Sequence, residues 1–458
     1  MTNVLAIDMG SSSIRGYVAQ TQPGSDVELT EVFRHHHQVE SSADGLTWNV
    51  AQLCEAAVQA CRAATEFLGE APDSVAVDGW GVDFVPVDKH GVPTGPAYAY
   101  RDERGAQGRA LLARFLDEQD SFSESGVAAQ DINSINRIAL YGHGEMELPE
   151  GTESIMFLQD VVARYLATAE IDSWEPGSDP GPWASVGVAS TSGLLSTNHK
   201  EWNQKVAQAT RIERRYLPDV QPELTEISRR GTTRLIRAGS HDTACAAYAM
   251  GVGPGDIFVS CGSWAVVGVI TDDALVSDSA FQAGITNEAC VDGTNRALLN
   301  LTGMWLVQEC IRHWNSQGME LSYDLAEELV ERAPSLGWVF DPQDEHFNQP
   351  GAMPIRIAEV VRNQWPEYGK STEIDLEDPG TILRLIFESV ARRIANGIST
   401  LRSESSLSGQ IFVAGGAVKH QFFMRLLSEY LNEELVVCSG EATVLGNVKA
   451  QVATLHAG

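Results

Sequence analysis

Two segments of the chain share one pattern of apolar and small polar positions. Residues 4–20 read VLAIDMGSSSIRGYVAQ, and residues 257–270 read IFVSCGSWAVVGVI. Each pattern predicts an apolar strand, a short turn of glycine and serine, and a second apolar strand. Such turns leave backbone N–H groups uncovered, and their hydroxyls add donors for an anion such as phosphate. One such turn is a weak indication, whereas two suggest facing lobes that hold the phosphates of a nucleotide between them.

The residues after the first turn exclude two common phosphate loops. A P-loop and a dinucleotide-binding loop each open a helix with a fixed spacing of glycines. Here residues 14–19 continue as a strand, so the turn is the tip of a β-hairpin. Asp8, at the end of the first strand, is a candidate for binding Mg²⁺, and Arg15 is a candidate for neutralising phosphate charge. The alternative is an ordinary hairpin with an Asp-capped turn, and the motif alone does not decide between them.

The remaining pattern alternates strands with amphipathic helices, which predicts a layered α/β domain in each half. The predicted helices cover about 50–69, 303–315, 322–333 and 381–402. The basic stretch 228–240 marks the clearest boundary, which divides the chain into residues 1–235 and 236–458. Two acidic, Gly/Pro-rich segments, 141–153 and 171–183, are predicted loops.

The composition limits the classes of function. A chain of 458 residues exceeds what one hydrophobic core usually organises. Its 62 acidic and 32 basic residues give a formal net charge of −30, so we expect it to bind neither nucleic acid nor membrane. The N-terminus lacks a basic leader of the secretory type, and the seven cysteines form no C-x-x-C pair. These features favour a cytoplasmic protein with reduced thiols, and they leave open whether it forms a homodimer.

Asp242, in AGSHDTACA, is the strongest candidate for a catalytic residue. It follows a short apolar strand and precedes the second glycine–serine turn by about 20 residues. A carboxylate there suits a general base that deprotonates a hydroxyl for phosphoryl transfer. The alternative is that Asp242 caps a helix over TACAAYAM. The two roles are compatible, because a helix N-terminus also favours an anionic base and nearby phosphate.

Two further glycine motifs are candidates for contacts with small molecules. In VDGWGVDF, Trp80, Gly81 and Asp83 combine an aromatic ring, an open backbone and a carboxylate, which is typical of sugar sites. The alternative, a plain hairpin with a buried tryptophan, is the more frequent arrangement. The pair Gly415 and Gly416, between a strand and a helix, would let adenosine or its phosphates approach the backbone, although such glycines are widespread.

Taken in order, DMGSSSIR, DGWGVDF, YRDERG, SHDTA, SCGSW and VAGGA resemble the motifs of the FGGY carbohydrate kinases. The resemblance spans essentially the whole chain. It implies two actin-like (ribonuclease H-like) α/β lobes, with ATP and sugar in the cleft between them, and ATP and Mg²⁺ as cofactors. Within the family, WGVDF, TNE (286–288) and NLTGMWLVQ (300–308) are most similar to the rhamnulokinase subfamily.

The resemblance also implies a role for each matching residue. Asp242 takes the place of the proton acceptor. The implied sugar contacts are Gly81, His241, Thr243 and Asn300. The implied ATP contacts are Ser11, Ser12, Ser13, Arg15, Ser263, Gln308 and Gly416, to which the turns themselves add Gly10 and Gly262.

The implied reaction is transfer of the γ-phosphate of ATP to the primary hydroxyl of a ketose, from L-rhamnulose to L-rhamnulose 1-phosphate. The chain departs from the subfamily at Ser263, where threonine is common, and over 127–150 and 174–183. Because the first lobe sets the choice of sugar, these departures leave another substrate open: L-fuculose, xylulose, ribulose or a related polyol. A non-catalytic sugar-binding regulator is a further alternative, although a pure binder needs no general base such as Asp242.

Overall fold

The computed structural model describes residues 2–22, 27–172, 174–347, 349–365 and 375–457. Internal contacts divide the chain into two compact units. Unit 1 consists of Met1–Val252, Ile270–Ala297 and Glu441–Gly458, and unit 2 consists of Gly253–Val269 and Leu298–Gly440. Each unit combines strands and helices, as the alternating pattern predicted. The division of the sequence at 235/236 stays a prediction.

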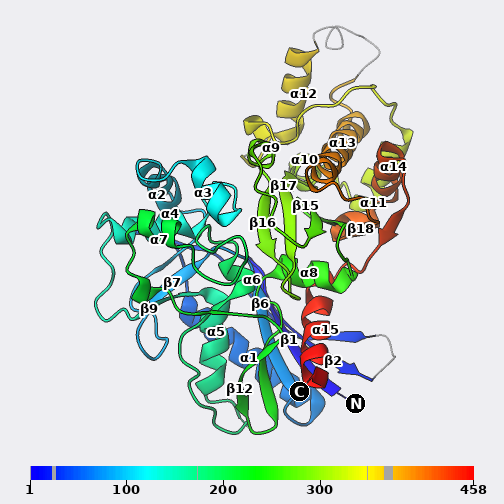
Figure 1. Ribbon diagram of the computed structural model, residues 1–458. Coiled ribbons are helices and arrows are strands. Elements are labelled where there is room, and N and C mark those ends of the chain that lie inside the picture. Colours follow the sequence, from blue (N-terminus) through cyan, green and yellow to red (C-terminus); the bar gives the residue numbers. More distant parts are fainter. Residues whose placement is uncertain (1, 23–26, 173, 348, 366–374, 458) are drawn as a thin grey trace. The chain divides into compact units, whose positions relative to one another are not determined.

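A six-stranded sheet in the order β12-β13-β6-β1-β2-β3 forms the centre of unit 1 (Figure 1). Its strands are β1 (Thr2–Met9), β2 (Ser13–Thr21), β3 (Glu28–His36), β6 (Ser74–Gly79), β12 (Thr225–Arg230) and β13 (Thr233–Arg237). Strands β1 and β2 pair antiparallel across the first glycine–serine turn, which confirms the predicted hairpin. Strand β6 runs parallel to β1 and to β13. The basic stretch 228–240 thus contributes to two strands of this sheet.

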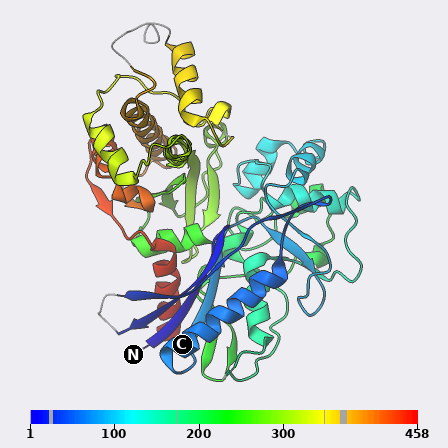
Figure 2. The same cartoon turned by 180° about the vertical axis from the view of Figure 1, so that it is seen from behind.

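The alternation of residues along β1 decides which helices cover each face of the sheet. Leu5 and Ile7 belong to the core cluster that contains α1 (Val50–Leu68) and α5 (Leu158–Thr168). Val4 and Ala6 point the other way and pack with α15 (Ala442–Ala457). Figures 1 and 2 show α1, in blue, and α15, in red, on opposite faces of these strands. Because successive strand residues alternate between faces, Asp8 lies on the face that α15 covers.

Helix α15 is held closely against both the sheet and α8 (Asp242–Met250). Gln451 donates from Nε2 to the carbonyl oxygen of Leu5 over 2.9 Å and accepts at Oε1 from Ser74 Oγ over 2.6 Å. Gly446 faces α8 so closely that a Cβ atom there would overlap the carbonyl oxygen of Cys245. The first residue of α8, Asp242, is therefore placed by the packing of α8 on α15.

The strands on either side of the Trp80 turn belong to different sheets. Strand β6 is central in the large sheet, whereas β7 (Phe84–Val87) pairs with β9 (Ser154–Phe157). The expected strands are present, but they do not pair as a plain hairpin. The other elements of unit 1 are β4 (Glu40–Ser42), β5 (Gly45–Trp48), β8 (Ala97–Tyr98), α2 (Arg104–Leu112), α3 (Glu118–Ser125), α4 (Ser134–Gly142), β10 (Ala184–Ser185), α6 (Val186–Ala189), α7 (Gln204–Thr210), η1 (Arg214–Tyr216), β11 (Val220–Gln221), α9 (Asp278–Ala283) and β16 (Thr286–Ala289).

The second predicted hairpin is also present. Strands β14 (Ile257–Cys261) and β15 (Trp264–Thr271) pair antiparallel in a sheet ordered β16-β17-β15-β14-β18-β19. Its other strands are β17 (Asn295–Thr302), β18 (Ile411–Ala414) and β19 (Leu435–Val437). The helices of unit 2 are α10 (Trp305–Ser316), α11 (Tyr323–Arg332), η2 (Glu345–Phe347), α12 (Met353–Gln364), α13 (Pro379–Ser405), η4 (Gly416–Lys419) and α14 (Gln421–Leu431). Within the described ranges, no helix has the length and apolar character to cross a membrane.

Replacing Gly446 by Ala should destabilise the protein, because the added methyl group must push α15 away from the backbone of α8. We expect a loss of about 2 kcal/mol in the free energy of unfolding, as for other overpacked sites. Denaturant titration measures this loss. Gly440→Ala is the matched control, since nothing lies within 4 Å of a Cβ added there. Equal stability of the two variants would contradict the close packing of α8 and α15.

Candidate active site

The first glycine–serine turn has a fixed backbone at the surface of unit 1. Gly10 N donates to Ser13 O over 2.9 Å, and His37 N donates to Ser12 O over 3.1 Å. The ring of His37 holds the same turn through Nε2, which is 2.9 Å from Gly10 O. Ser11 and Ser12 are exposed. The turn therefore offers hydroxyls on a rigid backbone, as anion binding requires.

Arg15 is paired with carboxylates. Its Nε donates to Asp8 Oδ2 over 3.0 Å, Nη2 contacts the same oxygen, and Nη1 donates to Glu441 Oε2 over 3.0 Å. Asp8 is 4% exposed. Burial raises the pKa of Asp8, and the charge of Arg15 opposes this shift. The guanidinium of Arg15 thus pairs with Asp8 and Glu441 in this structure. The sequence had suggested that it would instead face a bound phosphate.

Asp78 is an acidic residue of this site that the sequence analysis missed. It is the penultimate residue of β6 and the register partner of Asp8 on β1. Asn447 Nδ2 donates to Asp78 Oδ2 over 2.6 Å, while Oδ1 is buried with no hydrogen-bond partner among the described residues. Burial raises the pKa of Asp78 well above its usual range, and the charge of Asp8 adds to the shift. The signal was present, because AIDMG and AVDGW share an apolar strand ending in Asp and a small turn.

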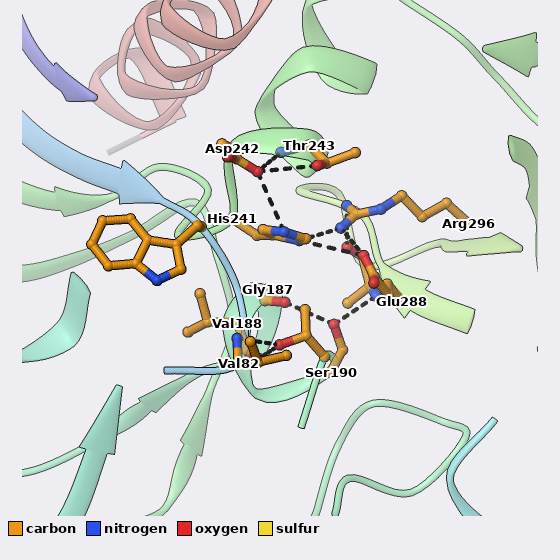
Figure 3. A network of polar contacts seen from close by, with 12 residues as sticks. Val82, Gly187, Val188, Ser190, His241, Asp242, Thr243, Glu288 and Arg296 are labelled. Carbon is orange, nitrogen blue, oxygen red and sulfur yellow. Dashed lines mark hydrogen bonds and ion pairs between the residues drawn. The ribbon is translucent and has the colours of Figure 1, made fainter. Parts of the chain in front are cut away.

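Asp242 is the first helical residue of α8 and the most accessible of the three carboxylates. Thr243 donates to Asp242 Oδ1 from its backbone N over 2.5 Å and from Oγ1 over 3.0 Å (Figure 3). His241 Nε2 lies 3.3 Å from the same oxygen. Within the described part of the chain no hydrogen bond reaches Oδ2, and the side chain is 33% exposed. The charge of Asp242 contributes to the raised pKa values of Asp8 and Asp78, so the three carboxylates act on one another.

Glu288 and Arg296 form a buried ion pair behind His241. Arg296 Nη2 is 2.5 Å from Glu288 Oε2 and 2.5 Å from His241 Nδ1. Burial favours a higher pKa for Glu288, but the adjacent guanidinium of Arg296 and, after it, the contact with His241 together outweigh burial and lower that pKa to about 2. The sequence signalled Glu288 only as part of TNE, and it gave no sign of Arg296, because neither residue lies near His241 along the chain.

The side chain of Asp83 anchors the Trp80 turn through hydrogen bonds. Asp83 Oδ2 accepts from Trp48 Nε1 over 2.6 Å and from Trp80 Nε1 over 2.9 Å, and Oδ1 accepts from Arg137 Nη1 over 2.8 Å. Asp83 is 1% exposed and Trp80 is 8% exposed. A side chain on Gly81 would come within 2.9 Å of Thr191, so the turn needs glycine there. Asp83 therefore supports the turn, and Gly81 packs closely against Thr191.

Unit 2 contains a pocket of about 320 Å³ that collects three of the predicted ATP residues: Gly262, Gln308 and Gly416. Ser263 Oγ donates to Gln308 Oε1 over 2.8 Å, which ties the second turn to α10. Gly415 has φ of 91°, and a Cβ there would lie 2.6 Å from Cys261 O. The rest of the lining comprises Met304, Tyr323, Asp324, Glu327, Ala417, Lys419 and His420.

Asn300 lies outside this set. It is exposed on β17, and its carbonyl oxygen accepts from Gln343 Nε2 over 3.3 Å. The predicted residues therefore divide by unit. Unit 1 carries Asp8, Gly10, Ser11, Ser12, Ser13, Arg15, Trp80, Gly81, Asp83, His241, Asp242 and Thr243, and unit 2 carries Gly262, Ser263, Asn300, Gln308, Gly415 and Gly416.

Comparison with known proteins assigns both halves of the chain to domains of one family. Residues 3–234 match the N-terminal domain of the FGGY family of carbohydrate kinases, and residues 257–455 match its C-terminal domain. The chain belongs to this family, whose members use ATP.

Relatives cover nearly the whole chain. A rhamnulokinase of Pectobacterium carotovorum subsp. carotovorum is 25% identical over 99% of this chain and 88% of that protein. A rhamnulokinase of Enterococcus faecalis is 25% identical over 98% of this chain and 88% of that protein. These proteins are similar to this chain in sequence throughout both family domains.

Solved structures confirm the predicted α/β fold. A xylulose kinase from Lactobacillus acidophilus has a TM-score of 0.79 at 11% identity, with 100% of this chain and 90% of that chain covered. Plasmodium falciparum glycerol kinase with ADP has a TM-score of 0.78 at 15% identity, with the same coverage. At these identities the likeness concerns the fold alone.

Replacement of Asp78 and of Asp83 by asparagine should change the stability of the protein in opposite directions. The raised pKa of Asp78 means that its folded state keeps a proton which the unfolded state releases above about pH 3.9. Asp78 therefore costs stability as the pH rises from that value through its folded pKa. We expect Asp78→Asn to raise the melting temperature near neutral pH, and this gain to vanish in acid.

Asp83→Asn is the counterpart, because it leaves the buried Arg137 guanidinium without its anion. We expect it to lower stability by about 3–5 kcal/mol. Thermal unfolding of both variants across a pH series checks the pair. Destabilisation by Asp78→Asn near neutral pH would show that its charge is compensated in the folded protein.

Proposed function

We propose that this sugar kinase transfers the γ-phosphate of ATP to the primary hydroxyl of L-rhamnulose, with Asp242 as the general base. The proposal rests on the surroundings of the two carboxylate oxygens of Asp242. One oxygen is held by Thr243 and faces His241, the other oxygen has no hydrogen-bond partner among the described residues, and the side chain is 33% exposed. The choice of sugar rests on the two relatives named rhamnulokinase.

In this mechanism Asp242 Oδ2 accepts the proton of the sugar hydroxyl as its oxygen attacks the γ-phosphorus of ATP. The bond from that phosphorus to the bridging oxygen breaks, and ADP leaves with the electron pair. Asp242 stands at the N-terminus of α8, whose dipole favours an anion there. His241 and Thr243 flank the base, and Gly81 in the Trp80 turn is a proposed contact for the sugar. A positioned base of this kind contributes about 10²–10⁴-fold to the rate.

The acidic residues of unit 1 fit a divalent cation. Asp8 and Asp78 are register partners with raised pKa values, and Asp78 Oδ1 is a buried oxygen with no partner among the described residues. A cation would offset the repulsion between these carboxylates. Within the described ranges there is no cluster of three or more acidic, cysteine or histidine side chains arranged for a metal. Two carboxylates suit Mg²⁺, which keeps several waters and, when bound, neutralises phosphate charge.

The pocket of unit 2 supports the proposed ATP site. Its volume of about 320 Å³ falls in the range of pockets that hold small organic molecules. Gly262 and Gly416 leave its wall open for close approach of adenosine or its phosphates. Lys419 is the basic residue of the lining. In unit 1, the turn formed by Gly10, Ser11, Ser12 and Ser13 is proposed to bind phosphate as well.

A coupled assay for ADP formation tests the proposal directly. The purified protein is incubated with ATP and Mg²⁺ and with each of L-rhamnulose, L-fuculose, D-xylulose, L-ribulose or glycerol. We expect the highest kcat/KM with L-rhamnulose and a 1-phosphate product by NMR. A higher value with another sugar would reassign the substrate, and sugar binding without turnover on any of them would favour a non-catalytic regulator.

Asp242→Asn tests the general base. The amide keeps the shape of the side chain but cannot accept the proton, so kcat should fall at least about 100-fold while the affinities for ATP and sugar change only a few-fold. Steady-state kinetics and calorimetric titration give the two quantities. Asp256→Asn is the control, since Asp256 lies in a turn of unit 2 where it caps the backbone N–H groups of Gly253 and Gln410. Retention of a tenth of wild-type turnover in Asp242→Asn would remove the role.

A further inference from the structure

The imidazole of His241 lies between the proposed base and a buried ion pair. Its Nε2 is 3.3 Å from Asp242 Oδ1, and its Nδ1 is 2.5 Å from Arg296 Nη2 and 3.3 Å from Glu288 Oε2 (Figure 3). His241 is 7% exposed, and Arg296 is fully buried. The charged groups that contact the ring are therefore Asp242 on one side and Glu288 with Arg296 on the other.

The contact with Arg296 decides which ring nitrogen carries the proton. A guanidinium has five N–H donors and no acceptor, and it stays protonated in proteins. At 2.5 Å from Arg296 Nη2, Nδ1 of His241 has to provide the lone pair. A neutral imidazole with an unprotonated Nδ1 carries its proton on Nε2. That proton sits on the ring nitrogen that lies 3.3 Å from Asp242 Oδ1.

Arg296 is itself held in place on both sides. Its Nη1 donates to Ala289 O over 2.8 Å, and its Nη2 pairs with the carboxylate of Glu288 over 2.5 Å. Glu288 sits on β16, and Arg296 sits on β17. The guanidinium therefore has little freedom to turn away from His241.

We propose that Arg296 is a positioning residue that fixes His241 as the neutral Nε2–H tautomer, so that His241 holds Asp242 Oδ1 and leaves Asp242 Oδ2 to receive the substrate proton. Thr243 donates twice to the same Oδ1, so all three donors act on one oxygen. The opposite tautomer would place an imidazole lone pair against Asp242 Oδ1. Repulsion would then turn the carboxylate away from the position in which Oδ2 is free.

The catalytic part of this inference rests on the proposed function, whereas the tautomer does not. The tautomer can be read in the ligand-free protein from the ¹⁵N shifts of the imidazole nitrogens, after labelling with ¹⁵N-histidine. The His241→Gln variant identifies the His241 signals by their loss. We expect the Nε2–H pattern in the wild type near neutral pH. An Nδ1–H pattern or a doubly protonated ring would overturn the proposal even if no variant of Arg296 folds.

Two substitutions separate the contribution of Arg296 from that of Glu288. In Glu288→Gln the guanidinium remains, so the Nε2–H pattern should persist. In Arg296→Met the nearest partner of Nδ1 becomes the Glu288 carboxylate, an acceptor, so the signals should shift to an Nδ1–H or doubly protonated ring. Arg230→Met is the matched control, since Arg230 is also buried but donates to Leu166 O and Glu175 O. An unchanged tautomer in Arg296→Met would contradict the proposal.

Kinetics test the consequence for catalysis. We expect Arg296→Met to lower kcat by at least about 10-fold with KM for ATP within about two-fold, because the loss falls on the orientation of the base. In a His241→Gln background, where the side-chain amide donates without any tautomer, the same Arg296 substitution should have little further effect. An equal loss of kcat in both backgrounds would mean that Arg296 acts through general stability. If the wild type forms no ADP with any ketose, the proposed function fails while the tautomer result stands.

Discussion

Parallel pairing of β1 with β6 puts the carboxylates of Asp8 and Asp78 side by side on the face of the sheet that α15 covers. Two buried carboxylates repel each other and lack the solvation of water, and folding has to bear that cost. Arg15 offsets the charge of Asp8, and Asn447 gives Asp78 one hydrogen bond. The remaining charge of Asp8 and Asp78 is not compensated by the described residues. Groups that cost stability in this way are often found at functional sites, so these two residues are good candidates for one.

Close helix packing brings the third carboxylate to the same region. Gly446 lets α15 lie against the backbone of α8, and Gln451 and Ser74 fasten α15 to the strands. Gly79 and the residue before Asp242 also form a short bridge between β6 and the start of α8. The backbone of Asp242, the proposed base, is thus fixed by the contact of α8 with α15 and by the bridge to β6. Local hydrogen bonds are then enough to orient its side chain.

Local signals predicted the fold well and the site only in part. Strong alternation predicted both hairpins, and helical spacing predicted α1, α10, α11 and α13, because these features depend on neighbours in sequence. The same patterns placed Asp8 and Asp242 at element ends. They could not reveal that Arg296, 54 residues beyond Asp242, reaches His241, because that contact depends on how β16 and β17 pass α8. Nor could they show that Asp83 is enclosed by Trp48 and Arg137, which leaves it a supporting role.

Two buried arginine–carboxylate pairs, Arg137 with Asp83 and Arg296 with Glu288, lie in the part of unit 1 that contains the candidate site. Arg137 joins Asp83 to the carbonyl oxygen of Val82, and Arg296 joins Glu288 to that of Ala289. Replacing a buried pair of this kind by apolar residues often leaves stability unchanged or improves it, so stability alone does not explain why the chain keeps both. Each pair fixes a stretch of backbone: Arg137 fixes the Trp80 turn, and Arg296 fixes the strand end beside His241. In the proposed mechanism, a base that is oriented before the substrate arrives needs no rearrangement when the reaction occurs, and such preorganisation is what phosphoryl transfer requires of a protein.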